Sequence, residues 1–546
     1  MREFDVVVLG TGATGLLAAL TAHEAGARVG LFEKNDLVGG TTAMSGGVAW
    51  LPNNPQAAAA GIQDSPEEAL RYLESLSHGM TDSTLLETLV KTGPEMIDWI
   101  EKHTAMRFWP CKIPDYHPEH PGGKPEGGRS LEPSLFSFLE LGEWADRVAT
   151  GQYSDPETGD VYLSTGESPR AGGSGFILPE VMAERRTKRI NGRGRALAGH
   201  LLKACLDRGI EPVTGSRARE LVMDNGRVTG VIFEKQGEKF AVRASKGVVI
   251  ATGGFEFDKD LVKAFLRGPM HHPASLPSNT GDGLRMAMRA GAMLGNMREA
   301  WWVPVLAVPG ETRHGVQRTS LVLRERSLPG AILVNQDGVR FCNEAANYNA
   351  LGGAFHQFDP VKFGFKNLPC WLVFDQAYLR KYGFWEVPPG GELPEWVARD
   401  PSLAGLAGKI GIDADNFKQT VARWNANVSQ GRDPDFQRGD SAYDGWNGDN
   451  ALYPDRTSTL GPVIEGPFYA VQLHSSTLGT KGGPQTDARG AVLDVFGKAI
   501  PGLYAAGNAM AGVTGMVYGG AGGTLGPAMT FGYLAGRAAA TAPTVA

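Results

Sequence analysis

The sequence of 546 residues contains few cysteines and no recognisable metal-binding pattern. Its four cysteines are Cys111, Cys205, Cys342 and Cys370, and no two of them have the spacing of a metal or redox motif. They are too few for a disulfide-stabilised fold of this length, so we expect buried thiols in a reducing compartment. Because the 11 histidines include no His-Glu-x-x-His motif, we predict no metal site.

The sequence also lacks a long apolar run and a strong charge imbalance. No stretch of about 18 apolar residues is present to cross a membrane, and the first apolar strand is too short for a targeting signal. A net charge of -6 gives no indication of a nucleic-acid partner. We therefore expect a cytoplasmic protein that binds no nucleic acid, and peripheral association with a membrane surface stays open.

Glycine, by contrast, is abundant, with 74 residues that fall in clusters. The first cluster, Gly10–Gly15, lies between a short apolar strand and a helical pattern. Gly10 permits the turn, Gly12 lets the backbone approach a pyrophosphate, and Gly15 lets the helix pack on the strand. A diphosphate would then lie at the positive N-terminus of the helix. This arrangement predicts dinucleotide binding.

The second predicted strand ends in Glu33, which follows Gly10 at the spacing of a carboxylate that holds ribose hydroxyls. The next segment, Gly39–Gly47, is rich in glycine and hydroxyl side chains and can enclose more of a large cofactor. This favours FAD over NAD, although an ordinary surface loop is the alternative interpretation.

Later segments predict the remainder of an interrupted α/β domain. A helical pattern, a pair of strands around an Asp-Asn-Gly turn, a buried strand ending in glycines and a strand before the closing helix follow in order. They lie at residues 194–205, 218–233, 246–254 and 502–508.

We predict a Rossmann-like FAD-binding domain with an inserted α+β catalytic domain. The first part covers residues 1–291, with a loop-rich excursion at about 118–192. The inserted domain covers 292–455, which is richer in Trp and Pro, and residues 456–546 return to the FAD-binding domain.

Several of these segments together resemble the fumarate reductase/succinate dehydrogenase flavoprotein superfamily, over nearly the whole chain. Within it, the sequence is most similar to the 3-ketosteroid Δ1-dehydrogenases. The blocks that carry this similarity are Pro114–Glu119, Ser327–Asn335, Gly338–Glu344 with Tyr348 after it, and Tyr518–Gly532, the last being the most specific.

The resemblance implies FAD held without a covalent bond, because members that attach flavin covalently use a histidine where Thr41 and Thr42 stand here. The cofactor-binding residues that we predict come from all the glycine-rich segments. They are Gly10, Gly12, Ala13, Thr14, Gly15, Glu33, Lys34, Gly40, Thr41, Thr42, Ser45, Gly46, Gly47, Ala251, Thr252, Gly253, Gly254, Asn279, Gly281, Asp282, Gly507, Asn508, Gly523 and Leu525.

Desaturation beside a ketone needs donors on the ketone oxygen, a base for the acidified proton and a hydride acceptor, which flavin supplies. By family match, the Tyr518 hydroxyl and the Gly522 amide are the donors. The family's usual Tyr-Pro-Gly-Pro-Gly reads Tyr-Gly-Gly-Ala-Gly here, so the loop lacks two rigid prolines. A tyrosine that only caps a glycine turn is the structural alternative.

Tyr348 is the candidate base, and Tyr116 is the family-matched partner that would stabilise its phenolate by a hydrogen bond. Structural roles as buried or loop aromatics are the alternatives for both, and His117 is a weaker candidate base. A 3-ketosteroid substrate and an unidentified electron acceptor complete this interpretation.

Three other functions stay open. A related flavoenzyme acting on another steroid bond, such as a Δ4-(5α)-dehydrogenase, would share most of these features. A fumarate- or urocanate-type enone reductase is disfavoured because residues 476–483 lack the histidine motif of the carboxylate reductases and His474 is out of register. A flavin-bearing electron carrier or binding protein would need neither Tyr348 nor Tyr518.

Overall fold

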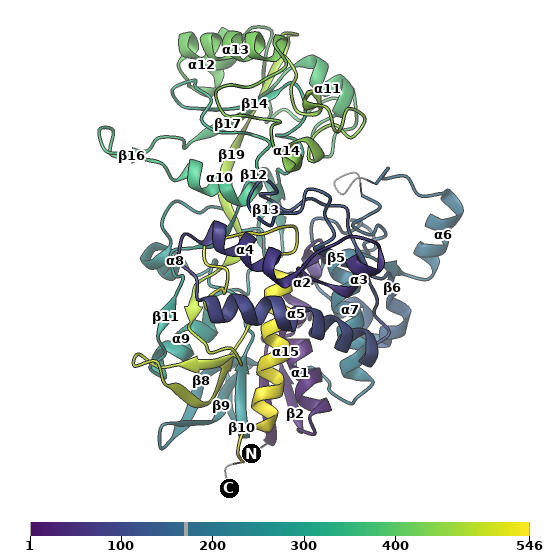
Figure 1. The fold of residues 1–546 in the computed structure, drawn as a ribbon, viewed down its shortest axis with the longest axis vertical. Helices are drawn as coiled ribbons and strands as arrows, with labels where there is room; N and C mark the ends of the chain where they lie inside the picture. Colours follow the sequence, from purple (N-terminus) through teal and green to yellow (C-terminus); the bar gives the residue numbers. More distant parts are fainter. Residues whose placement is uncertain (1, 169–172, 545–546) are drawn as a thin grey trace.

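Two large β-sheets organise the chain in the computed structural model, which describes residues 2–168 and 173–544. Each sheet forms the centre of one lobe, and both termini lie at the far end of the first lobe (Figure 1). None of the helices in these ranges is long and apolar enough to span a membrane.

The first sheet has seven strands in the order β2, β1, β10, β22, β21, and the hairpin β8–β9 extends from β10. Their bounds are β1 Arg2–Leu9, β2 Val29–Phe32, β8 Arg217–Asp224, β9 Arg227–Lys235, β10 Glu238–Ile250, β21 Ala491–Leu493 and β22 Ala499–Ala505. Strands β1, β2, β10 and β22 are parallel, so their carboxyl ends lie at one edge of the sheet. Crevices for ligands form at this edge in open α/β sheets.

Helices pack on the first sheet through close backbone contacts. Helix α1 (Ala13–Glu24) lies beside the C-terminal helix α15 (Leu525–Thr541), and α5 (Ser83–His103) runs across α15 (Figure 1). A Cβ on Gly536 would meet the Ala18 carbonyl oxygen at 2.2 Å, so only glycine permits this separation of α1 and α15. Helix α7 (Arg193–Leu206) also packs against α1, and it contains the helix predicted at residues 194–205.

The second sheet has six strands in the order β13, β12, β19, β17, β14, with β18 also paired to β19. Their bounds are β12 Ala300–Arg313, β13 Val316–Leu321, β14 Ala331–Asn335, β17 Cys370–Phe374, β18 Ala398–Asp400 and β19 Phe468–Thr480. Helices α10 Tyr348–Phe355, α11 Gln376–Tyr382, α12 Leu403–Ile410, α13 Ala414–Ser429 and α14 Ala442–Trp446 accompany it. Strand β19 lies beyond residue 455, so the range predicted to return to the first domain contains a central strand of the second sheet.

The segment 118–192 combines short strands and helices with loops. It contains β5 Ser130–Pro133, β6 Phe136–Ser137, a 3₁₀ segment Phe138–Arg147, α6 Pro179–Thr187 and β7 Ile190–Asn191. Residues 169–172 of this predicted excursion lie outside the described residues.

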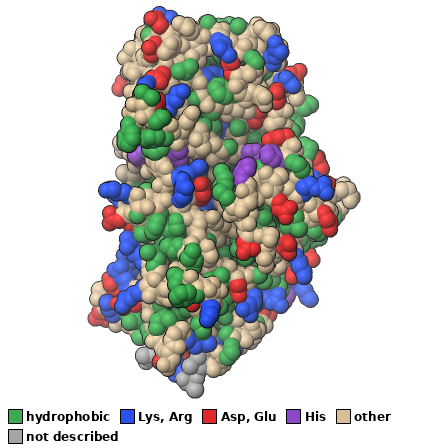
Figure 2. Space-filling model, turned by 60° about the vertical axis from the view of Figure 1, so that its left-hand side comes forward, with side chains coloured by type: hydrophobic (Ala, Val, Ile, Leu, Met, Phe, Trp, Pro, Cys, Tyr) green, Lys and Arg blue, Asp and Glu red, His purple; other side chains and the backbone are tan. Residues whose placement is uncertain are grey.

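Smaller elements complete the two lobes. They are α2 Gly40–Met44, β3 Ala49–Trp50, α3 Pro55–Ala59, α4 Pro66–Ser77, β4 Phe108–Pro110, α8 Lys259–Phe265, α9 Asp282–Arg289, β11 Leu294–Gly295, β15 Phe358–Asp359, β16 Gly364–Phe365 and β20 Gly483–Pro484. On the face seen in Figure 2, positive and negative side chains are interspersed, and histidine side chains gather at the level between the lobes.

Candidate active site

One large cavity opens at the carboxyl edge of the parallel strands and continues between the two lobes. Residues that directly follow the four parallel strands line it: Gly10, Glu33, Ala251 and Ala506. Eighteen of the predicted cofactor-binding residues line this cavity: Gly10, Gly12, Thr14, Glu33, Lys34, Gly40, Thr41, Thr42, Ser45, Gly46, Gly47, Ala251, Thr252, Gly253, Asn279, Asp282, Asn508 and Leu525.

The N-terminus of α1 faces the cavity through a tight glycine turn. Gly10 has a φ of 105°, and a Cβ there would meet the Ala251 carbonyl oxygen at 2.4 Å, which only glycine avoids. The first amides of an α-helix have no intrahelical partner, and here the Ala13 amide donates to the Thr42 hydroxyl (3.0 Å). The remaining positive end of the helix is suited to an anionic group in the cavity.

Glu33 is buried at the same edge with acceptor capacity to spare. One carboxylate oxygen accepts from the Thr11 amide (3.1 Å) and hydroxyl (2.7 Å), and the other accepts from the Asn35 amide (2.9 Å). Burial raises the pKa of Glu33, and these hydrogen bonds oppose the rise. An ionised carboxylate has about four acceptor sites, so one is left for a ligand hydroxyl.

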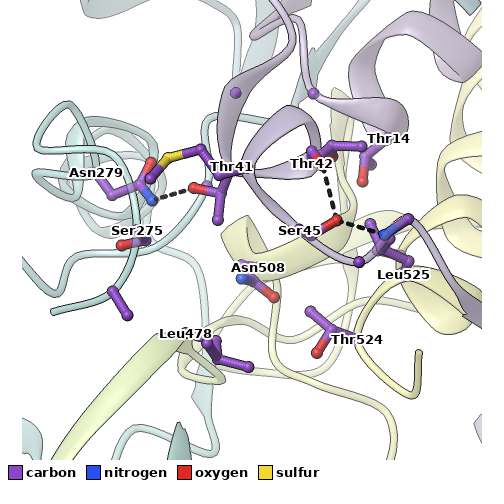
Figure 3. Close-up of a pocket in the computed structure, with 18 of the residues that line it drawn as sticks. Thr14, Thr41, Thr42, Ser45, Ser275, Asn279, Leu478, Asn508, Thr524 and Leu525 are labelled. Atoms are coloured by element: carbon purple, nitrogen blue, oxygen red, sulfur yellow. Dashed lines mark hydrogen bonds between the residues drawn. The ribbon is translucent and has the colours of Figure 1, made fainter. Parts of the chain in front are cut away.

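Hydroxyl and amide side chains continue along the cavity wall. Ser45 donates to the Thr42 carbonyl (2.7 Å), and Asn279 donates to the Thr41 hydroxyl (3.1 Å). In Figure 3, Ser45, Asn508, Thr524 and Leu525 surround one space. Thr252 also lines the cavity, but its hydroxyl is buried against Gly283 of α9 and has no hydrogen-bond partner among the described residues. The helix end, the spare acceptor site of Glu33 and these hydroxyl side chains together fit a dinucleotide.

Six predicted cofactor-binding residues do not line the cavity: Ala13, Gly15, Gly254, Gly281, Gly507 and Gly523. The glycines have packing reasons instead. A Cβ on Gly15 would meet the Gly10 carbonyl oxygen at 2.0 Å, and one on Gly254 would meet the Thr480 hydroxyl at 2.3 Å. Their direct contact with a cofactor stays a prediction.

Three tyrosines that the sequence places far apart meet where the cavity reaches the second lobe. The Tyr116 hydroxyl donates to the Tyr348 hydroxyl (2.9 Å). The Tyr518 ring centroid lies 5.1 Å from that of Tyr116 and 5.4 Å from that of Tyr348. All three are buried and line the cavity.

Each of these side chains is held by a different element. Tyr348 is the first residue of α10, whose N-cap Asn347 accepts from the Ala350 amide (3.0 Å) and also contacts the His117 ring nitrogen (3.0 Å). The Tyr116 amide donates to the Gly519 carbonyl (2.9 Å), which ties its loop to the glycine-rich turn. His117, the weaker candidate base, does not line the cavity.

Burial controls the acidity of this group. It raises the pKa of Tyr348 well above its usual value, and the neighbouring phenols Tyr116 and Tyr518 add to the rise. Burial likewise raises the pKa values of Tyr116 and Tyr518. All three are therefore neutral phenols at neutral pH, and a Tyr348 phenolate would depend on the hydrogen bond from Tyr116.

The turn after Tyr518 presents backbone to the cavity. Gly522 has a φ of 94°, and a Cβ there would meet the Val48 carbonyl oxygen at 2.4 Å. Its carbonyl accepts from the Trp50 amide (3.0 Å), whereas no residue in the described part of the chain accepts from its own amide. The Tyr518 hydroxyl is 3.0 Å from the Thr524 hydroxyl. Tyr518 and the Gly522 amide thus belong to one short segment of the cavity wall.

Sequence reasoning missed several residues that line the cavity. Tyr443 packs on Tyr116 with ring centroids 4.9 Å apart, and Tyr153, Trp446 and Arg313 also line it. No local motif marks these positions. His474 lies beside His272, with ring centroids 4.9 Å apart, and does not line the cavity.

Comparison with known proteins identifies the class. The family described as "FAD binding domain" matches residues 5–525. The chain belongs to this family of FAD-binding flavoproteins, which confirms the predicted fold class and its FAD-binding domain.

Individual relatives show which enzymes of this family the chain is similar to. The chain is 41% identical to 4-oxocyclohexanecarboxylate 2-dehydrogenase of Sinomonas cyclohexanicum, over 98% of this chain and 92% of the relative. It is 37% identical to 3-oxosteroid 1-dehydrogenase of Mycobacterium tuberculosis, over 98% of each. A crystal structure of 3-ketosteroid Δ1-dehydrogenase from Sterolibacterium denitrificans, in complex with 1,4-androstadiene-3,17-dione, has a TM-score of 0.91 and 35% identity, and the similarity covers 99% of this chain and 100% of that one. The predicted resemblance to 3-ketosteroid Δ1-dehydrogenases is confirmed.

Proposed function

We propose that this protein is an FAD-dependent 3-oxosteroid 1-dehydrogenase. The observation that supports it most directly is the hydrogen bond from Tyr116 to Tyr348 beside the buried Tyr518, in a cavity whose wall also includes Gly522 with its unpaired amide. This arrangement provides both donors and the base that desaturation beside a ketone requires.

Each of these groups has a separate role in the proposed reaction. The Tyr518 hydroxyl and the Gly522 amide donate to the ketone oxygen and stabilise the negative charge that develops there. Tyr348 acts as its phenolate, after its own hydroxyl proton has left to solvent, and it becomes a neutral phenol again when it accepts the proton from carbon 2. The Tyr116 hydroxyl donates to the Tyr348 oxygen and stabilises the phenolate before the transfer. FAD, when bound, supplies at its N5 the acceptor for the hydride that leaves carbon 1.

The cofactor would be held without a covalent bond by the residues that line the cavity. The α1 N-terminus with Gly12 fits the diphosphate, and Glu33 fits the ribose hydroxyls. Thr41 and Thr42 stand where covalently attaching relatives use a histidine.

Desaturation of a monocyclic keto acid is the second candidate, and the 41% identity to 4-oxocyclohexanecarboxylate 2-dehydrogenase favours it. Both reactions abstract a proton beside a ketone and a hydride from the next carbon, so the three tyrosines serve either one. The two candidates differ in substrate length and charge.

Anaerobic mixing tests the proposal. The FAD-loaded protein is mixed with androst-4-ene-3,17-dione, and in parallel with 4-oxocyclohexanecarboxylate, while the flavin absorbance is followed. Bleaching with the steroid and formation of the 1,4-diene are expected. Bleaching with the keto acid alone would favour the second candidate, and a product desaturated at another bond would overturn the 1,2-regiochemistry.

A further inference from the structure

A β-hairpin of the second lobe covers the far part of the cavity. Strands β12 and β13 pair from Val305 and Leu321 near the tyrosines to Arg313 and Val316 at the tip. The tip reaches the first lobe, because the His314 ring contacts the Thr150 carbonyl (2.9 Å). Closer to the tyrosines, the Leu321 amide donates to the Gln152 side chain (3.2 Å). The hairpin is thus anchored to the first lobe at two points.

One face of β13 lines the cavity. Gln317, Thr319 and Leu321 line it in alternation, whereas Arg318 does not, as expected for a strand whose successive side chains point to opposite faces; at the tip, Val316 lines it as well. Arg318 is instead paired with Glu311 and Glu386. The two acids whose charges act on Arg313 are thereby already paired with Arg318.

Arg313 is the exception on this hairpin. Its side chain lines the cavity and is half-buried. Within the described ranges 2–168 and 173–544, this side chain makes no hydrogen bond or ion pair. Burial lowers the pKa of Arg313, and Arg318 lowers it further while Glu386 and Glu311 oppose this. An arginine remains charged in proteins, so a partly buried cation faces the cavity without a partner. Such a group is an unused site for an anion.

The length of the hairpin places this cation far from the tyrosines. Leu321 packs in the cluster that contains Tyr116, Tyr348 and Tyr518. Val316, the cross-strand partner of Arg313, lies five positions before Leu321, and a strand rises about 3.4 Å per residue, so these two backbone positions are about 17 Å apart. A single-ring keto acid cannot span this length between its ketone and its carboxylate, whereas a steroid with an acidic side chain can.

We propose that Arg313 binds the carboxylate of a 3-ketosteroid that carries an acidic side chain at the end opposite the ketone. This rests on the proposed function, and it names a substrate class within it: steroid acids rather than neutral steroids. Arg313 recognises the substrate and takes no part in the transfer of the proton or the hydride. The long cavity under β13, lined by Thr319 and Leu321, holds the apolar rings between the two ends.

Steady-state kinetics with three substrates test this. The substrates are androst-4-ene-3,17-dione, 3-oxochol-4-en-24-oic acid and 4-oxocyclohexanecarboxylate. Arg313→Gln should raise KM for the steroid acid about tenfold, the size expected for loss of one charge-assisted contact, and leave the neutral steroid unaffected. Arg313→Lys should restore part of the affinity. Arg318→Gln is the matched control, because it removes a charge from the opposite face of the same hairpin.

Salt gives an independent readout. With the unaltered protein, KM for the steroid acid should rise with ionic strength while KM for the neutral steroid does not. Arg313→Gln should abolish that dependence.

Two results would overturn the proposal. Equal KM effects of Arg313→Gln on the neutral and acidic steroids would mean that the arginine only supports the hairpin. A selective effect on 4-oxocyclohexanecarboxylate would place the guanidinium close to the ketone. Failure of the unaltered protein to turn over any 3-ketosteroid would instead reject the proposed function. Calorimetric binding of the steroid acid to Arg313→Gln and to Arg318→Gln would still decide the role of Arg313.

Discussion

At the scale of single residues, the site depends on three phenols whose hydroxyls have different surroundings. The Tyr116 hydroxyl donates to Tyr348, and Tyr518 is near the Thr524 hydroxyl (3.0 Å). The fourth buried phenol, Tyr443, contacts the group only through its ring, and its hydroxyl has no hydrogen-bond partner in the part of the chain that the structure describes. The hydroxyl of Tyr443 is thus separable from the proposed chemistry.

Tyr518→Phe should therefore lower kcat for androst-4-ene-3,17-dione by about 10²–10³, the usual cost of removing one donor to a developing oxyanion. FAD content and the unfolding midpoint should stay close to those of the unaltered protein, because the ring contacts are kept. Tyr443→Phe removes an equivalent hydroxyl from the same cavity and should change kcat little. Equal losses in both variants would assign Tyr518 a packing role.

The predicted site residues that line the cavity come from local motifs or from segments that carry the resemblance. Gly10, Gly12 and Glu33 lie within one strand–helix–strand unit, so their spacing alone predicts that they converge. Tyr153, Tyr443 and Arg313 carry no such signal. They reach the cavity through loops and a hairpin whose placement depends on tertiary packing.

At the scale of elements, the turn between Tyr518 and α15 is shaped by its backbone contacts. Its Gly522 carbonyl accepts from Trp50 in β3, and the Tyr116 amide donates to Gly519. Contacts to neighbouring segments hold the turn although the two prolines of the related sequences are absent. The contact with Val48 leaves no room for a Cβ at Gly522.

Gly522→Ala should destabilise the protein and reduce turnover together. The left-handed φ of 94° alone costs an alanine about 1–2 kcal/mol, and the 2.4 Å contact with the Val48 oxygen must also be relieved by moving β3 or the turn. Gly497→Ala is the matched control, since Gly497 also has a positive φ (77°) but no atom within 4 Å of its Cβ position. Thermal unfolding measures the loss of stability, and kcat measures the loss of turnover. A Gly522→Ala variant as stable and as active as Gly497→Ala would contradict the tight packing at Gly522.

At the scale of the whole molecule, the second sheet pairs two strands, β12 and β19, that sequence reasoning assigned to different domains. Strand β19 pairs with β12, although well over a hundred residues separate them in the chain. Such pairing leaves no local trace, since β19 has the same apolar composition that a strand of either sheet would have. The domain boundary predicted at residue 455 therefore lies before β19, which is a strand of the second sheet and leads back to the first lobe.

Lys481 follows directly after β19 and lies fully buried at this junction. Its ammonium donates to the Val517 carbonyl (2.8 Å) and lies 3.9 Å from the Trp301 ring centroid. Burial lowers its pKa to about 7, Glu299 opposes the shift, and Arg267 adds to it. Between about pH 7 and about pH 10.5 the unfolded chain holds a proton that the folded protein has released. The free energy of unfolding should therefore rise with pH through this window, and this contribution is lost as the pH falls to 7.

Lys481→Met should flatten that rise, because the substituted side chain has no proton to release. Measured by thermal or denaturant unfolding, the variant should gain most relative to the unaltered protein at and below about pH 7, where the buried lysine must carry its charge. Lys498→Met, which removes an exposed lysine, should leave the slope unchanged. The opposing force is attraction of the ammonium to the Trp301 ring and the Val517 carbonyl. If that attraction outweighs the cost of burial, Lys481→Met will instead be less stable at neutral pH and the two profiles will run parallel, which would show that the lysine keeps its charge inside the folded protein.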